Sequence, residues 1–246
     1  MRIAVVNTQV PFIRGGAEIQ ADSLIRELRV RGHEADLVTV PFKWYPPERI
    51  AEHVVSCWNI DLTESEGRSI DRVIALKFPA YCIPHPNKVI WLCHQFRQAY
   101  DLWENGQSEL LQTSQGESIR AFVKFADEEA FDGSKSLFSN AKNTAARVKK
   151  FNGRDCQPLY PPNSFLTGSE RSKSYDNFIL YPSRINRMKR QHLVVQAFCQ
   201  SKANLDLYVV GPQDDKTYLD QMIKSVQKAD AEDRVKFLGP VDDDTL

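Results

Sequence analysis

The sequence has no excess of charge of either sign and no long apolar run. Lys and Arg together number 32, and Asp and Glu together number 32. Bulk electrostatic attraction to nucleic acid is therefore not indicated, and no nucleic-acid partner is expected. No stretch approaches the ~20 apolar residues of a membrane span. Residues 1–7 turn polar too soon for a signal peptide, so we expect a cytoplasmic protein.

Cysteine pairs with metal-ligand or redox spacing are also absent. The chain has five cysteines, and no two of them form a C-x-x-C pair. An odd number of widely spaced cysteines favours reduced, buried thiols over a disulfide framework or a zinc site. The cysteines are Cys57, Cys82, Cys93, Cys156 and Cys199.

The first part of the chain alternates between strand and helix patterns. A continuous apolar run at 2–7 predicts a buried strand. A helical pattern then ends at Gly32, and a second strand follows at 34–40. Such βαβ units build a doubly wound parallel sheet. The same patterns predict further strands at 71–77, 88–93 and 135–139, helices at 48–58 and 118–131, and a helix capped by Asn140 that runs to residue 150.

A second α/β series follows a change of composition. We predict a first domain at 1–162, a Pro-, Gly- and Ser-rich linker at 163–176, and a second domain at 177–246. In the second domain the patterns predict strands at 178–181, 205–210 and 234–238, with helices at 190–201 and 217–228. This series is too short for a full doubly wound domain, so we expect the second domain to be incomplete.

Gly15 and Gly16 stand between the first strand and the first helix. Ligands of parallel α/β sheets bind where strand ends meet helix N-termini. Two glycines let the backbone approach an anion and present bare N–H groups. The loop is neither G-x-G-x-x-G nor a P-loop with its lysine, so a nicotinamide-binding oxidoreductase or a Walker-type site is disfavoured. A simple turn explains the same glycines, and the residues alone leave both interpretations open.

Polar residues follow three other predicted strands. His94 ends the strand at 88–93, although an isolated histidine at such a position more often has a structural role. Arg184 and Lys189 flank the turn after the strand at 178–181, where a diphosphate or a solvated basic loop explains their charge. Gly211 follows the strand at 205–210 and would present its backbone at the same edge, although an ordinary strand-ending turn is the simpler explanation of this glycine alone.

Taken in order, these motifs resemble the retaining glycosyltransferases of group 1, or family 4, with the GT-B fold. The resemblance rests on the residues around Gly15-Gly16, on His94 and on the crossover at 160–163. It continues through the run at 181–198, which contains Arg184 and Lys189, and through 207–212 and 234–241. It implies an α/β protein with two Rossmann-like domains.

The resemblance also implies a reaction. Gly15 and Gly16 would lie beneath the donor diphosphate, His94 near the transferred sugar, and Gly211 at the donor site. Arg184 and Lys189 would neutralise the diphosphate leaving group, so no metal or other cofactor is expected. The partners would be a nucleotide-sugar donor and a carbohydrate or lipid-linked acceptor. We expect the site in a cleft between the domains, and peripheral association with the inner face of a membrane stays open.

The chain departs from the family pattern at three places. Ser183 and Arg190 replace residues that are commonly glycine, and the family's later pair of glutamates has no counterpart before residue 246. We therefore expect a truncated chain of weak activity or none. Two alternatives share the fold: a non-catalytic nucleotide-sugar-binding module, and a nucleotide-sugar epimerase.

Overall fold

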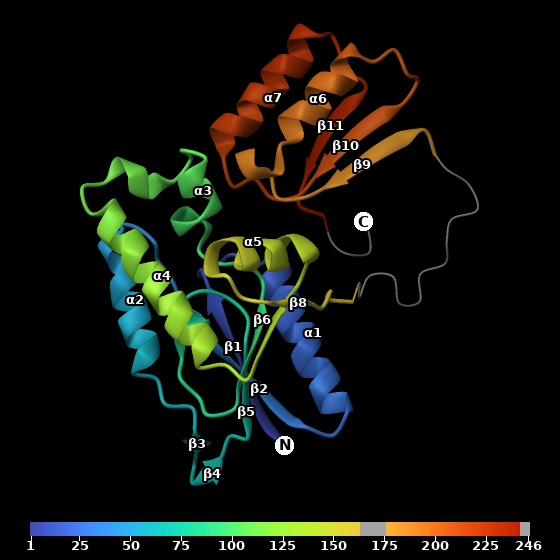
Figure 1. Cartoon of the computed structure of the whole chain (residues 1–246). Helices are drawn as coiled ribbons and strands as arrows, with labels where there is room; N and C mark the ends of the chain where they lie inside the picture. The colour runs from blue at the N-terminus through green and yellow to red at the C-terminus, as the bar shows by residue number, and fades with distance from the viewer. Residues whose placement is uncertain (163–175, 242–246) are drawn as a thin grey trace. The chain divides into compact units, whose positions relative to one another are not determined.

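The structure is a computed structural model that describes residues 1–162 and 176–241 (Figure 1). The chain divides into two compact units, Met1–Gly168 and Ser169–Leu246. The predicted linker lies, except for Asp176, outside the described residues, so its bounds stay a prediction. None of the described helices combines the length and the apolar character needed to cross a bilayer.

The first unit is built on a six-stranded sheet in which every neighbouring pair is parallel. The strand order is β2-β1-β5-β6-β7-β8. These strands are β1 (Arg2–Gln9), β2 (Glu34–Pro41), β5 (Arg72–Ala75), β6 (Lys88–Leu92), β7 (Ser136–Ser139) and β8 (Gln157–Pro158). The patterns did not predict β8 or the small antiparallel hairpin of β3 (Glu64–Ser65) and β4 (Arg68–Ser69).

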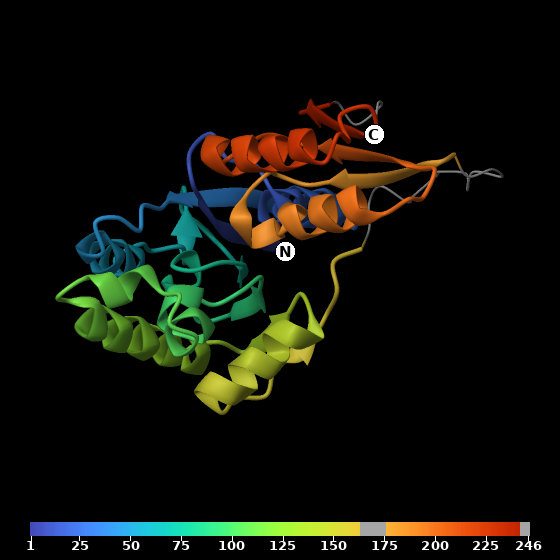
Figure 2. The ribbon, with the colours of Figure 1, turned by 90° about the horizontal axis from the view of Figure 1, so that it is seen from above.

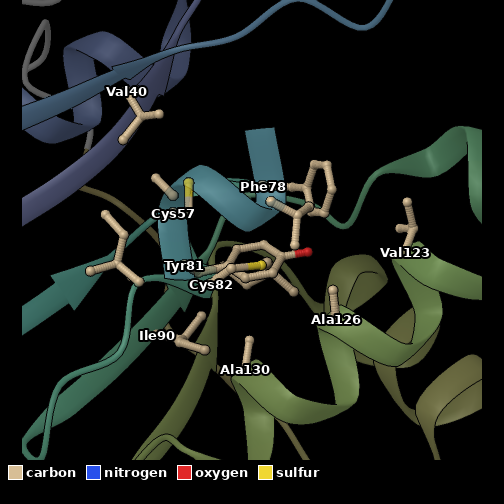
Figure 3. Close-up of a cluster of buried hydrophobic side chains, with 14 of the residues drawn as sticks. Val40, Cys57, Phe78, Tyr81, Cys82, Ile90, Val123, Ala126 and Ala130 are labelled. Carbon is tan, nitrogen blue, oxygen red and sulfur yellow. The ribbon is translucent and has the colours of Figure 1, made fainter. Parts of the chain in front are cut away.

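Helices cover both faces of this sheet, as a doubly wound fold requires (Figure 1). They are α1 (Gly16–Val30), α2 (Glu48–Trp58), α3 (Asp101–Glu104), α4 (Gly116–Asp132) and α5 (Lys142–Asn152). Side chains alternate along a strand, so β1 contributes to two cores. Ile3 and Val5 pack with Ala21 of α1. Ala4 and Val6 join the larger cluster that includes residues of α2 and α4 (Figure 3).

Two local predictions were wrong for identifiable reasons. Asn140 does not cap α5, which begins at Lys142 after Ala141. The Asn140 N–H continues the sheet pattern by donating to the Leu92 carbonyl, and its side-chain oxygen accepts from the Thr144 hydroxyl. The proline-rich segment at 78–86, for which the patterns predict neither strand nor helix, forms one turn of 3-10 helix at Ala80–Cys82.

The second unit has a parallel sheet in the order β11-β10-β9. Its elements are β9 (Phe178–Pro182), α6 (Gln191–Gln200), β10 (Asp206–Val210), α7 (Lys216–Lys228) and β11 (Val235–Gly239). All five correspond to predicted elements. The helices α6 and α7, orange and red in Figure 2, pack in one cluster with Leu207 and Val209 of the sheet. Both therefore cover the same face.

Candidate functional site

The strand order of the first unit places a ligand edge at the carboxyl end of β1. The chain passes from β1 to β2 on one side and then returns to β5 on the other side of β1. Open parallel sheets bind ligands at such a reversal, beyond the carboxyl ends of the strands. Gly15 and His94 lie in loops at this edge, after β1 and β6, and Gly16 is the first residue of α1. The structure thus brings the predicted residues of the first unit to one edge.

The Gly15-Gly16 turn opens α1 and differs from the prediction in one respect. The Gly15 N–H is not bare, because it donates to the Glu18 carboxylate at 2.8 Å. Among the described residues, nothing accepts from the Gly16 N–H. A Cβ at Gly16 would meet no atom within 4 Å, and the backbone at Gly15 is extended. No contact within the unit therefore requires glycine at Gly16, and open space lies over the start of α1.

Lys77 was missed as a site residue, although it lies two residues after the end of β5. Its Nζ lies 3.8 Å from Oε1 of Glu18, and both side chains are largely shielded. The Thr8 hydroxyl fixes this loop, since it donates to the Lys77 carbonyl and accepts from the Ala80 N–H. Sequence reasoning treated Lys77 only as the end of a strand. Its position beyond the carboxyl end of that strand was the available signal.

His94 is half-buried and held by its own backbone loop. Its Nδ1 lies 2.7 Å from the Gln95 carbonyl oxygen. Burial lowers the pKa of His94, and the positive charges of Lys77, Arg147 and Arg97 lower it further against the opposing hydrogen bond to Gln95. The imidazole is therefore neutral at pH 7. A carbonyl can only accept, so Nδ1 carries the proton and Nε2 keeps a lone pair that can accept from a ligand hydroxyl.

Two arginines and a carboxylate lie beside His94. Arg97 donates twice to Asp101, with a closest distance of 2.6 Å, and Arg147 lies 3.6 Å from the same carboxylate. Burial works against ionisation of Asp101, but the Arg97 hydrogen bond and the two positive charges outweigh it and lower its pKa. Nε of Arg147 is buried and has no acceptor among the described residues. Only the spacing of four between Arg97 and Asp101 was visible in the sequence.

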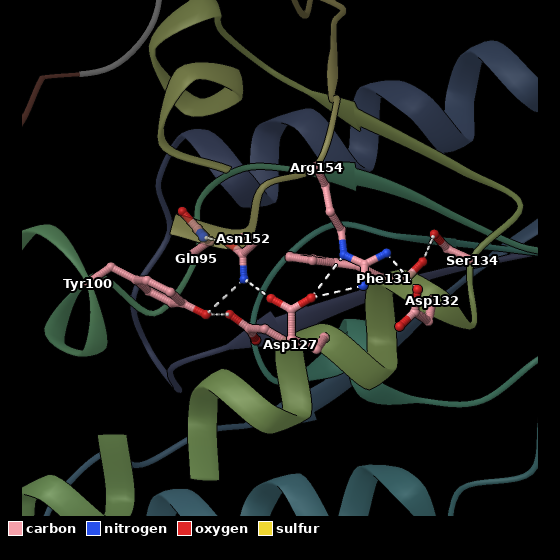
Figure 4. A network of polar contacts seen from close by, with 9 residues as sticks. Gln95, Tyr100, Asp127, Phe131, Asp132, Ser134, Asn152 and Arg154 are labelled. Atoms are coloured by element: carbon pink, nitrogen blue, oxygen red, sulfur yellow. Dashed lines mark hydrogen bonds and ion pairs between the residues drawn. The ribbon is translucent and has the colours of Figure 1, made fainter. Parts of the chain in front are cut away.

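A buried polar network anchors the loop that carries His94 (Figure 4). Asp127 of α4 is fully buried and accepts from the hydroxyls of Tyr81 and Tyr100, each at 2.7 Å. Asn152 donates to the Tyr100 hydroxyl and accepts from the Gln95 side chain. Tyr100 is 1% exposed, so its ring belongs to the core and is not available to stack on a ligand.

Burial raises the pKa of Asp127 to about 7, although the tyrosine hydrogen bonds oppose the rise. An unfolded aspartate titrates near 4, so the folded state takes up a proton between about pH 4 and pH 7. The contribution of Asp127 to the free energy of unfolding is thus fully present below about pH 4. It is lost as the pH rises to about 7, by up to about 4 kcal/mol.

We expect Asp127→Asn to remove this pH dependence. The stability of the wild type relative to the variant should fall from pH 4.5 to pH 7.5. Urea unfolding followed by tryptophan fluorescence measures it, because all four tryptophans lie in Met1–Gly168. Glu129→Gln, an exposed change on the same helix, is the control and should show no such trend. A stability difference that stays constant or rises with pH would contradict the assignment.

The basic loop of the second unit connects β9 to α6 and is only partly free. Arg184 lies 3.3 Å from Asp214, and Arg187 lies 3.6 Å from Asp215. No carboxylate among the described residues pairs with Lys189. The loop contains three arginines and one lysine, and only two aspartates pair with them, so it keeps a net positive charge. The cations are Arg184, Arg187, Lys189 and Arg190. The charge of Arg184 is therefore partly compensated, although its side chain is 35% exposed.

Hydrogen bonds fix the shape of this loop. The Lys189 carbonyl accepts from the Tyr181 hydroxyl at 2.6 Å, and the Lys189 N–H donates to the Asn186 side chain. Gln191, which is fully buried, donates to the Arg184 carbonyl at 2.8 Å. Arg190 has a positive φ of 58°. This conformation favours glycine, which gives a physical reason for the glycine that the family commonly has there. Helix α6 accordingly starts at Gln191, not at Arg190.

Gly211 has a structural role that the sequence did not reveal. Its φ is +136°, and a Cβ there would lie 2.3 Å from the Ser183 carbonyl oxygen. Its N–H donates to the Gly239 carbonyl at 2.8 Å. The N–H of Gly211 is therefore used within the sheet, and its predicted role at the donor site stays a prediction.

We expect Gly211→Ala to destabilise the second unit by at least about 2 kcal/mol, because strain at the positive φ adds to overpacking against the backbone of the Arg184 loop. Hydrogen–deuterium exchange of the β10 amides reports the local free energy of opening. Gly239→Ala is the matched control, since Gly239 has φ +69° and no atom within 4 Å of a Cβ. It should cost about 1 kcal/mol. Equal costs for the two variants would refute the contact.

Comparison with known proteins identifies what this arrangement resembles. Residues 165–246 match the model of the family "Glycosyl transferases group 1". A comparison with curated protein sequences gives no significant match. Among solved structures, Anabaena Alr3699/HepE in complex with UDP-glucose matches with a TM-score of 0.61 and 14% identity, over 99% of this chain and 70% of that one.

Two further structures agree on the fold. The catalytic domain of starch synthase IV from Arabidopsis thaliana, bound to ADP and acarbose, gives a TM-score of 0.61 at 8% identity, over 98% of this chain and 74% of that one. AviGT4, a glycosyltransferase involved in avilamycin A biosynthesis, gives a TM-score of 0.50 at 15% identity, over 97% of this chain and 63% of that one. The expected fold is confirmed: the protein has the α/β architecture of GT-B glycosyltransferases, and its last third is similar in sequence to group 1.

Proposed function

We propose that the protein is a retaining glycosyltransferase of the family 4 class. It would move a sugar from a nucleotide-diphosphate sugar to a carbohydrate or lipid-linked acceptor in polysaccharide or glycoconjugate biosynthesis. The observation that carries the proposal is the net positive loop of Arg184 and Lys189, within the segment that matches group 1 glycosyl transferases. The UDP-glucose and ADP held by two similar structures support a nucleotide-sugar donor.

The candidate site residues of the two units suit this chemistry. Breaking the bond between a sugar and a nucleoside diphosphate builds negative charge on the departing phosphate, and preplaced cations stabilise it. Arg184 can grip two phosphate oxygens, and Lys189 adds a compact charge. The Gly16 N–H and the open space beside it allow close approach of the diphosphate. The neutral His94 can accept a hydrogen bond from a hydroxyl of the transferred sugar.

The ion pair with Asp214 has a consequence for the proposed role of Arg184. A bound diphosphate would compete with one carboxylate for the guanidinium, and it carries more charge and more acceptor oxygens than that carboxylate. Asp214 also accepts from Asn186 at 2.9 Å, so it keeps a partner when Arg184 turns to a ligand. The pair therefore holds Arg184 in place without blocking the site.

We expect Arg184→Ala to abolish the thermal protection that nucleoside diphosphates give the wild type. UDP and ADP are the first ligands to test, in a thermal-shift assay. Arg184→Lys should keep part of the protection, because it retains the charge and loses the bidentate geometry. Lys202→Ala, an exposed change in the same unit, should protect like the wild type. Unchanged protection in Arg184→Ala would remove Arg184 from the site.

Product analysis tests the reaction itself. Turnover of UDP- or ADP-sugars by the protein, which we expect to be weak, should release nucleoside diphosphate only when an acceptor is present. Proton NMR of the new glycosidic bond should show the anomeric configuration of the donor. An altered nucleotide sugar formed without acceptor would favour the epimerase. Nucleotide binding without any turnover would favour the non-catalytic module.

A further inference from the structure

A cavity of about 510 Å³ lies in the first unit, at the end of the sheet opposite to His94. Lys88, the first residue of β6, lines this cavity, whereas His94 follows the carboxyl end of the same strand. The C-terminal ends of α2 and α4 and the loop before β6 form its walls, and the lining residues fall within 58–63, 82–88 and 129–133. A ligand bound here would therefore lie outside the candidate active site.

Lys88 is the strongest sign that this cavity takes a ligand. The residue is 3% exposed, and its Nζ donates to the Tyr81 carbonyl at 3.0 Å. An ammonium has three N–H groups, and no other group in the described part of the chain accepts from this one. A Cβ on Gly133, which also lines the cavity, would lie 3.9 Å from the Nζ. The ammonium therefore lies at the cavity wall.

The charge of Lys88 has no counter-charge nearby. Burial lowers the pKa of Lys88, and no carboxylate in residues 1–162 or 176–241 opposes this effect. The C-terminus of α4 is close, at Gly133, and offers the partial negative charge of a helix end. No carbonyl of α4 accepts from the Nζ, however. Buried charges are normally paired, and a carboxylate inside the cavity would supply the missing partner.

Two carboxylates of opposite charge to Lys88 stand on exposed residues of the lining, Asp61 and Glu129. Asp61 accepts from the hydroxyl and the N–H of Thr63, at 2.7 and 2.8 Å. These hydrogen bonds lower the pKa of Asp61, so it keeps its charge. Glu129 forms no ion pair within the described residues, unlike Glu128 of the same helix. The cavity thus has a positive group inside and negative groups at its rim.

The rest of the lining is mostly apolar. Trp58 contributes an indole ring that edge contacts with Phe122 and Phe125 hold in place, at centroid distances of 5.6 and 6.3 Å. The other apolar side chains of the lining are Ile60, Cys82, Pro84, Pro86 and Ala130. A ligand that satisfies the charges of this cavity therefore also needs an apolar body.

The loop before β6 is rigidly held, and it offers no metal ligand. His85 is 6% exposed; its Nδ1 accepts from the Asn87 N–H at 3.0 Å, and its Nε2 donates to the Ile70 carbonyl at 3.1 Å. Burial raises the pKa of the Cys82 thiol well above its usual value, so it is not a thiolate. Among the residues that the structure describes, no group of three His, Cys, Asp or Glu could hold a metal ion.

The charge pattern selects among organic ligands. A simple carboxylate would be repelled at the rim by Asp61 and Glu129, and a simple amine would leave Lys88 without a partner. A molecule that carries both charges is complementary to both parts of the cavity. We propose that this cavity binds an α-amino acid with an apolar side chain, its carboxylate on Lys88, its ammonium toward the rim carboxylates and its side chain against Trp58. The site does not depend on the proposed glycosyltransferase function.

Isothermal titration calorimetry on the full chain tests the proposal with ligands that differ by one charge. The probes are L-phenylalanine and L-leucine, their N-acetyl derivatives, and the amines phenethylamine and isoamylamine. At least one of the two amino acids should bind. Its N-acetyl derivative lacks the ammonium and its amine lacks the carboxylate, so each should bind at least about tenfold more weakly, because a charge-assisted hydrogen bond is lost.

Variants assign the binding to this cavity. Lys88→Met should abolish it, and the double change Asp61→Asn and Glu129→Gln at the exposed rim should weaken it about tenfold. Glu117→Gln, an exposed change in the first turn of α4, is the control and should bind like the wild type. Circular dichroism establishes that each variant is folded, and the rim variant decides the question if Lys88→Met is not.

Three results would overturn the proposal. The first is that neither amino acid binds. The second is that the N-acetyl derivative or the amine binds as tightly as its parent, since the cavity would then not select a zwitterion. The third is that folded Lys88→Met, or the rim variant, binds as the wild type does.

Discussion

The burial of a parallel sheet on both faces is the constraint on which the first unit depends. Ile3 and Val5 of β1 pack toward α1, while Ala4 and Val6 pack toward the opposite core. No side chain in the middle of this strand can reach solvent, so polar chemistry is confined to the strand ends. The candidate site follows from this confinement. Gly15, Lys77 and His94 lie in loops after the carboxyl ends of β1, β5 and β6, and Gly16 opens the helix that follows β1.

The candidate residues of each unit show how charge is balanced within that unit. Glu18 is held by the Gly15 N–H and Lys77, Asp101 by Arg97 and Arg147, and Asp214 by Arg184. Each cluster orders long side chains before any ligand arrives, which lowers the conformational entropy lost on binding. Cations exceed carboxylates beside His94 and in the Arg184 loop. Both places therefore carry a net positive charge.

Below this edge, a buried carboxyl group organises the loop of His94. Asp127 accepts from Tyr81 and Tyr100, and Asn152 links Tyr100 to the Gln95 side chain. A buried polar network is costly unless its members are satisfied, and it then specifies a single arrangement of the segments that it joins. We infer that the network positions the backbone that binds Nδ1 of His94. It contains no residue proposed to touch the substrate.

The sequence by itself determined the α/β class, the order of nearly all the strands and helices, and the loops that carry Gly15, Gly16, His94, Arg184 and Lys189. Local periodicity and turn residues encode these features, because each depends on a few consecutive side chains. Only the tertiary structure decided which polar groups meet. The Glu18–Lys77 pair, the Asp127 network and the contact of Gly211 with Ser183 join residues that are distant in the chain. The buried ammonium of Lys88 was hidden for the same reason: the burial and bonding of a side chain are properties of its neighbours in space.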